Sequence, residues 1–435
     1  MLGLDSRELS PGLVDRIICL SAETRSYHRA EIVLRRFGHE ASDNTVQRVT
    51  GEIGHELVKR RDADPRSAES LAARPAAVPA LAVVECDGGR FRMREPGHGR
   101  GVHLSGEGWR ETKNACLISA THQTFDADPQ PEPPDCFLDP KHVAKIAETQ
   151  ALSVAAPKAA ALPSDDVVSE RDATVEDVFE AAVTSKKPKK DWRPKRLVRT
   201  VVASVRCSRD FGRQVAREAK RRRFFEAQAK AFLGDGLAWN WTIWKEHFPN
   251  FTPILDFIHP LSYLFLAAKT VHPSSDDDAW GQYVAWMRGC WRGEVGQVLD
   301  ELQTWQTKLG TPPDKCPATD PCQIIASTLT YLMNNRERMN YPAYRQAGLP
   351  ITTAWMESLV KEMNYRVKGT EMFWNDPDGG EAILQVRAGA LSDDDRLSRH
   401  IRTRPGCPFT RRPKSPKLQQ NPLQSLTKAE MHPDP

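Results

Sequence analysis

The segment Ala231-Phe-Leu-Gly-Asp235-Gly-Leu-Ala-Trp-Asn-Trp241 constrains the fold more than any other part of this 435-residue chain. A short apolar run ends on a carboxylate and a glycine, and a Trp-rich segment of helical character follows. This pattern predicts a buried strand that ends at Asp235, whose side chain faces solvent or a ligand. Residues 81–86 form a second apolar run that leads into Asp87 in the same way. One such aspartate would be an ordinary turn residue, but two of them, far apart in sequence, predict one carboxylate site assembled by the fold.

The elements around these two aspartates follow a recognisable order. After the apolar run, the glycines at 88–89 predict a turn, and residues 90–95 alternate as a half-exposed antiparallel strand does. The order predicts an α/β fold with an RNase H-like mixed sheet flanked by helices. In such a sheet the first and fourth strands are neighbours, so Asp87 and Asp235 would lie side by side. The remaining predicted elements are strands at 113–120, 197–205, the run ending at Asp235 and 252–258, and helices at 211–230 and 239–247.

A late helix adds a third carboxylate, Glu357. Thr352 or Thr353 is predicted to cap this helix, which would lie on the sheet and bring Glu357 alongside the two aspartates. Three carboxylates suit phosphodiester cleavage, because two Mg²⁺ ions about 3.5–4 Å apart neutralise both the attacking and the leaving oxygen. The alternative for each aspartate is an ordinary turn residue, and the alternative for Glu357 is a solvated residue on the surface of a helix. The predicted buried side of the helix consists of Met356, Leu359, Val360 and Met363.

The N-terminal region is predicted to form three helices. Gly38 stops the second helix, and Ser42 or Asp43 can cap the third. A helix, a Gly-containing turn and a capped helix have helix-turn-helix spacing, for which a plain three-helix bundle is the alternative. The outward face of the third helix carries side chains that can reach base edges in a major groove. These candidate DNA-binding residues are Asn44, Thr45, Gln47 and Arg48.

Basic residues are concentrated in blocks, although the net charge of the chain is only +4. The blocks lie at 186–199, 213–223 and 402–417 and favour a polyanionic partner, nucleic acid first; solvated surface is the alternative for any one of them. The nine cysteines include no C-x-x-C pair and fit a reducing cytosol. No apolar run is long enough to span a bilayer. We therefore expect a cytoplasmic protein without a membrane partner.

Composition and periodicity together predict eight segments along the chain. The prolines, acids and lysines of the middle segment predict a partly disordered linker. A Trp-rich stretch without strand alternation predicts an all-helical insertion, whose tryptophans at 280, 286, 291 and 305 favour a core over base-stacking platforms. The segments are 1–60 (helix-turn-helix), 61–79 (joint), 80–120 (first part of the catalytic core), 121–195 (linker), 196–274 (second part of the core), 275–345 (helical insertion), 346–395 (last part of the core, with the Glu helix) and 396–435 (basic, disordered tail).

An ordered set of motifs in this chain resembles the bacterial insertion-sequence transposases of the ISKra group, relatives of the mutator-like DDE enzymes. The resemblance covers residues 10–60 and, outside the linker, residues 80–395. The matching motifs are Asp87-Gly-Gly-Arg90, Trp109-Arg-Glu-Thr-Lys113, Asp235-Gly-Leu-Ala-Trp-Asn-Trp241, Ile254-Leu-Asp-Phe-Ile-His259, Gly348-Leu-Pro-Ile-Thr-Thr353, Met356-Glu-Ser-Leu-Val-Lys361 and Arg366-Val-Lys-Gly-Thr-Glu-Met-Phe-Trp374.

The resemblance implies a DDE triad of Asp87, Asp235 and Glu357 that binds two Mg²⁺ ions, for which Mn²⁺ would substitute. It implies an enzyme that binds the terminal repeats of its own mobile element through the N-terminal helices. Such an enzyme cleaves double-stranded DNA and joins the freed 3′-hydroxyl to target DNA. We expect it to work as a homodimer or higher synaptic complex in the bacterial cytoplasm, associated with the nucleoid.

The surroundings of Glu357 give further candidates. Many related transposases carry a basic residue two turns after the catalytic Glu, where this chain has Asn364; Lys361, one turn on, shares the face and is the substitute. Arg366 and Lys368 are candidates for phosphate contact. His259 follows a predicted strand beside the site, where it would hydrogen-bond near the metal ions or play a purely structural part.

Two other functions fit the same sequence. An RNase H-like nuclease or resolvase would cleave DNA without strand transfer. A DNA-binding remnant of a transposase would keep only the N-terminal helices, and its activity would not depend on Asp87 or Asp235.

Overall fold

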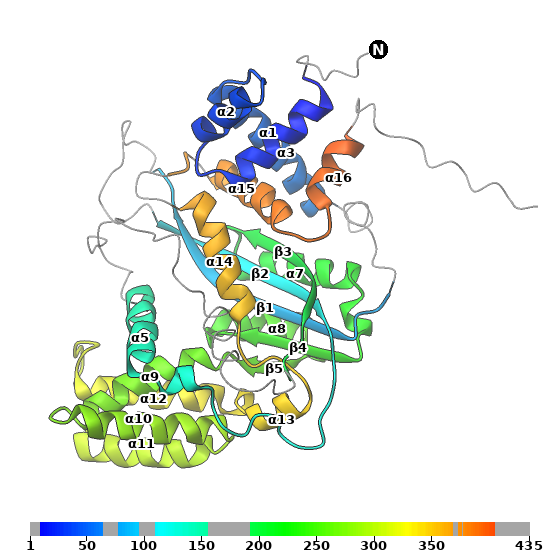
Figure 1. The fold of residues 1–435 in the computed structure, drawn as a ribbon. Coiled ribbons are helices and arrows are strands. Elements are labelled where there is room, and N and C mark those ends of the chain that lie inside the picture. The colour runs from blue at the N-terminus through cyan, green and yellow to red at the C-terminus, as the bar shows by residue number, and fades with distance from the viewer. Residues whose placement is uncertain are drawn as a thin grey trace, which may run out of the picture.

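The centre of the protein is a five-stranded mixed sheet with the strand order β3-β2-β1-β4-β5 (Figure 1). The computed structural model describes residues 9–63, 77–94, 109–154, 192–368, 373–375 and 377–404. β2 runs antiparallel to β1 and β3, whereas β4 is parallel to β1 and β5 is parallel to β4. This order and these directions are those of an RNase H-like sheet, so the predicted fold class is confirmed. The strands are β1 (Leu81–Arg92), β2 (Trp109–Ala120), β3 (Arg196–Ser204), β4 (Ala229–Gly234) and β5 (Thr252–Leu255).

The predicted turn at residues 88–89 is wrong. β1 continues through both glycines to Arg92 and pairs with β2 over its whole length, so the predicted strands at 81–86 and 90–95 are one strand. A Cβ atom on Gly89 would lie 2.6 Å from Oγ1 of Thr112 on the neighbouring strand. Gly89 therefore permits close approach between two strands, the other common reason for a glycine inside a strand.

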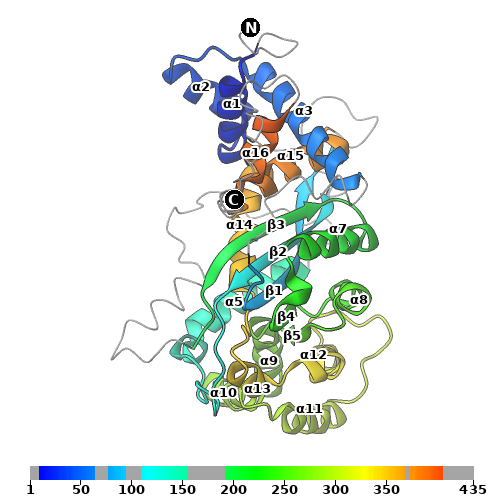
Figure 2. The same ribbon diagram turned by 90° about the vertical axis from the view of Figure 1, so that its right-hand side faces the viewer.

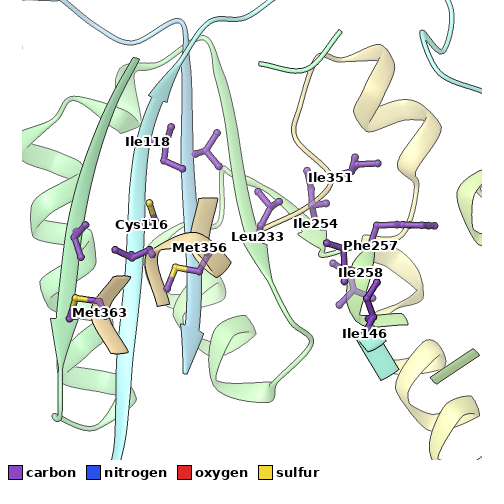
Figure 3. Packing of buried hydrophobic residues seen from close by; sticks show 14 of the residues in the cluster. Cys116, Ile118, Ile146, Leu233, Ile254, Phe257, Ile258, Ile351, Met356 and Met363 are labelled. Atoms are coloured by element: carbon purple, nitrogen blue, oxygen red, sulfur yellow. The ribbon is translucent and has the colours of Figure 1, made fainter. Parts of the chain in front are cut away.

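Alternate residues of β1 face two different helical layers, as the period of a strand requires. Ala82 and Val84 pack with residues of α7 and α8, and Leu81 and Val83 lie in the core on the opposite face. On that opposite face α14 packs against β1 and β2, and α15 packs against β3 (Figures 1 and 2). Figure 3 shows Met356 of α14 beside Cys116 of β2. The flanking helices are α7 (Ser208–Arg221), α8 (Ala238–His247), α14 (Ala354–Val367) and α15 (Pro377–Ala390), with a short 3-10 turn η3 at Phe224–Glu226.

The N-terminal residues form three helices, each preceded by a serine that caps it. The side chains of Ser10, Ser26 and Ser42 each accept a hydrogen bond from a backbone N–H in the first turn. This confirms the three predicted helices and the cap at Ser42. α1 and α3 pack against α15, α1 also packs against α16 (Arg396–Thr403), and α2 packs on α1 and α3 (Figure 2). They are α1 (Pro11–Glu23), α2 (Tyr27–Arg36) and α3 (Asp43–Asp62).

The first part of the predicted disordered tail is ordered, because residues 396–403 form helix α16 (Arg396–Thr403). Leu397 and Ile401, four residues apart, are buried on one side of this helix. His400 contacts both Glu56 and Arg60 of α3. The basic composition of the segment concealed its short apolar stripe. The remainder of the tail, residues 405–435, lies outside the described residues.

A bundle of helices extends from the end of β5 (Figure 1). It begins earlier than residue 275, because β5 ends at Leu255 and not at 258. It also includes α5 from the predicted linker, which packs against α9. Trp286 and Trp291 are fully buried, which confirms the core role for these two tryptophans. The bundle consists of α5 (Pro140–Val154), α9 (Ile258–Val271), α10 (Asp276–Trp291), α11 (Val295–Leu309), α12 (Pro321–Asn335) and α13 (Tyr341–Gln346), with 3-10 turns η2 (Asp135–Leu138) and η4 (Arg336–Arg338).

Residues 155–191 of the predicted linker lie outside the described residues, as do 64–76 of the predicted joint. None of the helices in the described segments is long and apolar enough to cross a membrane.

Gly348, between α13 and α14, provides a test of this packing. Its φ is +65°, and a Cβ atom there would lie 1.9 Å from the carbonyl oxygen of Gln123. We expect Gly348→Ala to lower the free energy of unfolding by at least about 2 kcal/mol, through backbone strain and overlap. Gly281 lies on the exposed side of α10, and a Cβ atom there would have no neighbour within 4 Å. Gly281→Ala should therefore raise the free energy of unfolding by roughly 0.5–1 kcal/mol. Denaturant unfolding of both variants measures the difference, and equal effects would contradict the packing described.

Candidate active site

The parallel part of the sheet places three aspartates next to one another. Cys86 pairs with Gly234, and Gly234 pairs with Leu255. Asp87, Asp235 and Asp256 each follow one of these paired residues, and adjacent strands lie about 4.8 Å apart. The Asp256 N–H donates to the carbonyl oxygen of Gly234 at 3.0 Å, which fixes the third aspartate beside the second. The register of the parallel strands therefore places Asp87 and Asp235 side by side, as the order of the strands predicts.

The carboxylate of Asp235 is oriented by the loop that follows it. Its Oδ1 atom accepts hydrogen bonds from the Leu237 N–H at 2.9 Å and from Nδ2 of Asn240 at 2.6 Å. Asn240 is fully buried and packs against Gly234, where a Cβ atom would lie 3.1 Å from the Asn240 side chain. Of the two carboxylate oxygens of Asp235, only Oδ1 accepts hydrogen bonds from described residues. Oδ2 is therefore the oxygen available to a ligand.

Asp256 is a functional candidate that the sequence analysis missed. It is fully buried; its Oδ1 accepts a hydrogen bond from the Thr353 N–H at 2.9 Å, and its Oδ2 lies 2.5 Å from Nδ1 of His259. It therefore connects the end of β5 to the start of α14. The signal was present, because an apolar run ends on this aspartate as it does before the other two. The predicted strand was drawn through to 258, which concealed the strand end.

Glu357 lies in the first turn of α14, on the helix that covers β1. Met356, Leu359 and Met363 are buried as predicted, whereas Val360 is only half-buried. Thr353 occupies the predicted cap position, but its side chain makes no capping hydrogen bond. Its backbone N–H donates to Asp256 instead, so a carboxylate of the site anchors the N-terminus of the Glu helix.

Burial and mutual repulsion raise the pKa values of these carboxyl groups. Burial first, and then the charge of Asp235, raises the pKa of Asp87 to about 7. Burial, followed by the charge of Asp256, raises the pKa of Glu357 to about 7 as well. The pKa of Asp235 is also raised, mainly by burial. Burial alone would lower the pKa of His259, but the hydrogen bond to Asp256 and the three aspartate charges raise it to about 9. A protonated imidazole thus lies among several carboxylates.

This arrangement fits a divalent cation. The available ligands are carboxylate oxygens, which Mg²⁺ and Mn²⁺ prefer, and carboxylates whose pKa values are raised gain most from a nearby cation. One group of three possible metal ligands in the described part of the chain has its ligand atoms within 4.8 Å of one another. This group is His28, Glu31 and Asp43, and it lies outside the site of Asp87, Asp235 and Glu357. Asp87, Asp235 and Glu357 do not all come that close, so binding shared ions would draw them together.

The four predicted DNA-reading residues lie near the start of α3. Asn44 and Gln47 are exposed, whereas Thr45 and Arg48 are half-buried. Arg48 also forms an ion pair with Glu52 at 3.3 Å. Asn44 and Gln47 are therefore the more accessible two.

The three basic candidates after Glu357 have different environments. Lys361 is exposed, and its charge lowers the pKa of Glu357. Lys368 is exposed, with Nζ 5.7 Å from the centre of the Trp109 ring, which the Arg92 guanidinium also covers at 4.8 Å. The prediction for Arg366 is not supported by its environment, because this side chain is only 1% exposed.

Arg366 connects the Glu helix to the N-terminal helices instead. Its Nε donates to the carbonyl oxygen of Ser21 at 2.5 Å, and its guanidinium lies 4.8 Å from the Tyr27 ring centre and 5.4 Å from that of Trp374. Sequence alone did not distinguish a buried arginine from a surface one, because both occur in polar helical segments.

Comparison with known proteins identifies no family. No family model matches this chain, and no curated protein sequence matches it. Among solved structures, the chain aligns with one from the Drosophila P element transposase strand transfer complex, at a TM-score of 0.34 and 9% sequence identity. The alignment covers 89% of this chain and 93% of the other. Similarity at this level does not define a shared function.

The raised pKa of Asp87 predicts how stability depends on pH. An acid that holds its proton more tightly in the folded state stabilises the protein at low pH, and this contribution is lost as pH rises through its folded pKa, here about 7. Asp87→Asn should therefore melt at a higher temperature than the wild type at pH 8, and the difference should shrink towards pH 4. Mg²⁺ should raise the melting temperature of the wild type but not of the variant. Asp300→Asn, which removes an exposed carboxylate, is the control. It should change neither the pH dependence of the melting temperature nor its response to Mg²⁺.

Proposed function

We propose that this protein is a DDE-type transposase, which binds the ends of a mobile DNA element, cleaves them and joins them to target DNA. The observation that carries the proposal is the placement of Asp87 and Asp235 after paired residues of adjacent parallel strands, with Glu357 on the helix covering the same sheet. The ordered motifs shared with the ISKra-group transposases support the same function. The raised pKa values of Asp87 and Glu357 support a site for divalent cations.

The proposed chemistry consists of two phosphoryl transfers. In the first, a water oxygen bonds to the phosphorus and the bond to the 3′-oxygen breaks, which frees a 3′-hydroxyl. In the second, the oxygen of that hydroxyl bonds to a target phosphorus and gives up its proton, while the bond from this phosphorus to the target 3′-oxygen breaks and that oxygen takes up a proton. Two Mg²⁺ ions, when bound, would neutralise the charge on the attacking and leaving oxygens.

The side chains of the site have distinct parts in this proposal. Asp87, Asp235 and Glu357 hold the metal ions, and Oδ2 of Asp235 is the atom that the loop leaves available. Asp256 is occupied by Thr353 and His259, so it acts as a positioning residue that fixes the Glu helix against β5. No covalent protein–DNA intermediate is involved, so the site needs no Ser or Tyr nucleophile.

DNA would be held by two groups of residues. Asn44 and Gln47 at the start of α3 can read base edges, and Lys361 and Lys368 can contact phosphates. Binding should weaken with salt, because neutralised phosphates release counterions. Two element ends must be joined to the target, so the working form would be a dimer or larger assembly. A nuclease without strand transfer would use the same carboxylates. The reaction product distinguishes the two functions, because a transposase yields joined DNA and a nuclease yields only cleaved DNA.

The first test is cleavage of DNA that carries the flanking ends of the element, with Mg²⁺ or Mn²⁺. We expect wild-type cleavage and joined products, and a loss of at least 100-fold in rate for Asp235→Asn, because a metal ligand is lost. Asp300→Asn should retain full rate. Cleavage without joining would indicate the nuclease, and DNA binding without cleavage by the wild type would contradict the enzyme.

A second test separates base reading from phosphate contact. Gln47→Ala should weaken binding to the element ends by about 1–3 kcal/mol and leave binding to unrelated DNA unchanged. Lys368→Ala should weaken both and reduce the slope of log affinity against log salt by about 1. Fluorescence anisotropy at several salt concentrations measures both quantities. Equal losses on both DNAs for Gln47→Ala would rule out base reading by this side chain.

A further inference from the structure

We infer that Tyr331, on helix α12 of the helical bundle, is a positioning residue that sets the location of Asp235. The inference rests on the proposed function, in which Asp235 is a metal ligand. Tyr331 lies 96 positions after Asp235 in the chain, and its hydroxyl donates a hydrogen bond to the main-chain oxygen of Asp235 at 2.8 Å. It touches no carboxylate oxygen, so its effect would pass through the backbone of the loop.

The ring of Tyr331 also lies directly on the residue after Asp235. Gly236 has a φ of +98°, and a Cβ atom there would be 2.7 Å from Cε2 of Tyr331. Glycine is thus required at this position both by the backbone conformation and by the ring. Because glycine by itself leaves the chain flexible, the contact with Tyr331 is what limits the conformations of the loop at this point.

Tyr331 is itself held by the bundle. Its ring stacks on that of Tyr263 from α9, with centres 4.1 Å apart and an angle of 10° between the planes. Thr328, one turn earlier on α12, directs its hydroxyl towards the carbonyl oxygen of Tyr263 at 3.4 Å. The stack of these two half-buried rings is therefore part of the packing between α9 and α12.

A second residue of α12 contacts the first turn of α8, the helix that follows this loop. Asn335, four positions after Tyr331, accepts a hydrogen bond from Nε1 of Trp241 at 3.0 Å, and its Nδ2 donates to the carbonyl oxygen of Tyr331 at 2.9 Å. Arg338 covers the Trp241 ring at 4.4 Å. One face of α12 thus spans the segment from Asp235 to Trp241.

These contacts have a functional consequence. Hydrogen bonds from Leu237 and Asn240 orient the Asp235 carboxylate relative to its own loop, but they do not fix that loop relative to the other carboxylates. Tyr331 supplies a support from outside the loop. A metal site needs its ligands held to within roughly 0.5 Å, so losing this support should weaken metal binding.

The test compares Tyr331→Phe with Tyr263→Phe in the full-length chain. Both variants keep the stacked pair of rings, but only the first loses the hydrogen bond to Asp235; no described residue hydrogen-bonds the Tyr263 hydroxyl. Mn²⁺ binding is measured by electron paramagnetic resonance, alongside melting temperature and cleavage rate. We expect Tyr331→Phe to bind Mn²⁺ about tenfold more weakly with little change in melting temperature, and excess Mn²⁺ to restore most of the cleavage. Tyr263→Phe should match the wild type.

Three outcomes would overturn the inference. Unchanged Mn²⁺ affinity in Tyr331→Phe would show that the hydrogen bond does not position Asp235. A parallel loss of affinity in both variants would assign the effect to the stack. A loss of affinity accompanied by an equal loss in Asp300→Asn would indicate a general change in charge or folding. A wild type that binds Mn²⁺ without cleaving DNA would contradict the proposed function and leave the Mn²⁺ comparison between the variants valid.

Discussion

The carboxylates beside β1, β4 and β5 repel one another, and the surrounding structure provides the contacts that keep them together. Burial adds to the cost, as the raised pKa values of Asp87 and Glu357 show. Asp256 is stabilised by Thr353 and by His259, whose charge also lowers the pKa values of its acidic neighbours. Folding therefore brings several acidic side chains together at one end of the parallel strands, an arrangement that a bound cation would stabilise.

The elements that hold this edge come from distant parts of the chain. Asp256 fixes the start of α14, Tyr331 supports the loop after β4, and Arg366 connects the end of α14 to α1 and α2. The helical bundle and the N-terminal helices are thus both attached to the elements that carry the acidic residues.

Much of the sheet and of its flanking helices could be predicted from the sequence, because their signals are local. The apolar runs before Asp87 and Asp235 predicted two strands, and the spacing of Met356, Leu359 and Met363 predicted the buried side of α14. Local signals also misled: the glycines at 88–89 look like a turn, yet Gly89 allows β2 to approach. The same limit applies to Arg366, whose guanidinium lies beside the rings of Tyr27 and Trp374, two residues outside its own helix.

The sequence by itself determined most of the strands and helices, because periodicity and capping act within a few positions. It therefore sufficed for the class of the sheet and for the strands that end before Asp87 and Asp235. Only the tertiary structure decided which strand ends are adjacent in register, that Asp256 is anchored to Thr353, and that Tyr331 reaches Asp235. These facts depend on contacts between residues about a hundred positions apart, and no local pattern encodes a distance of that kind.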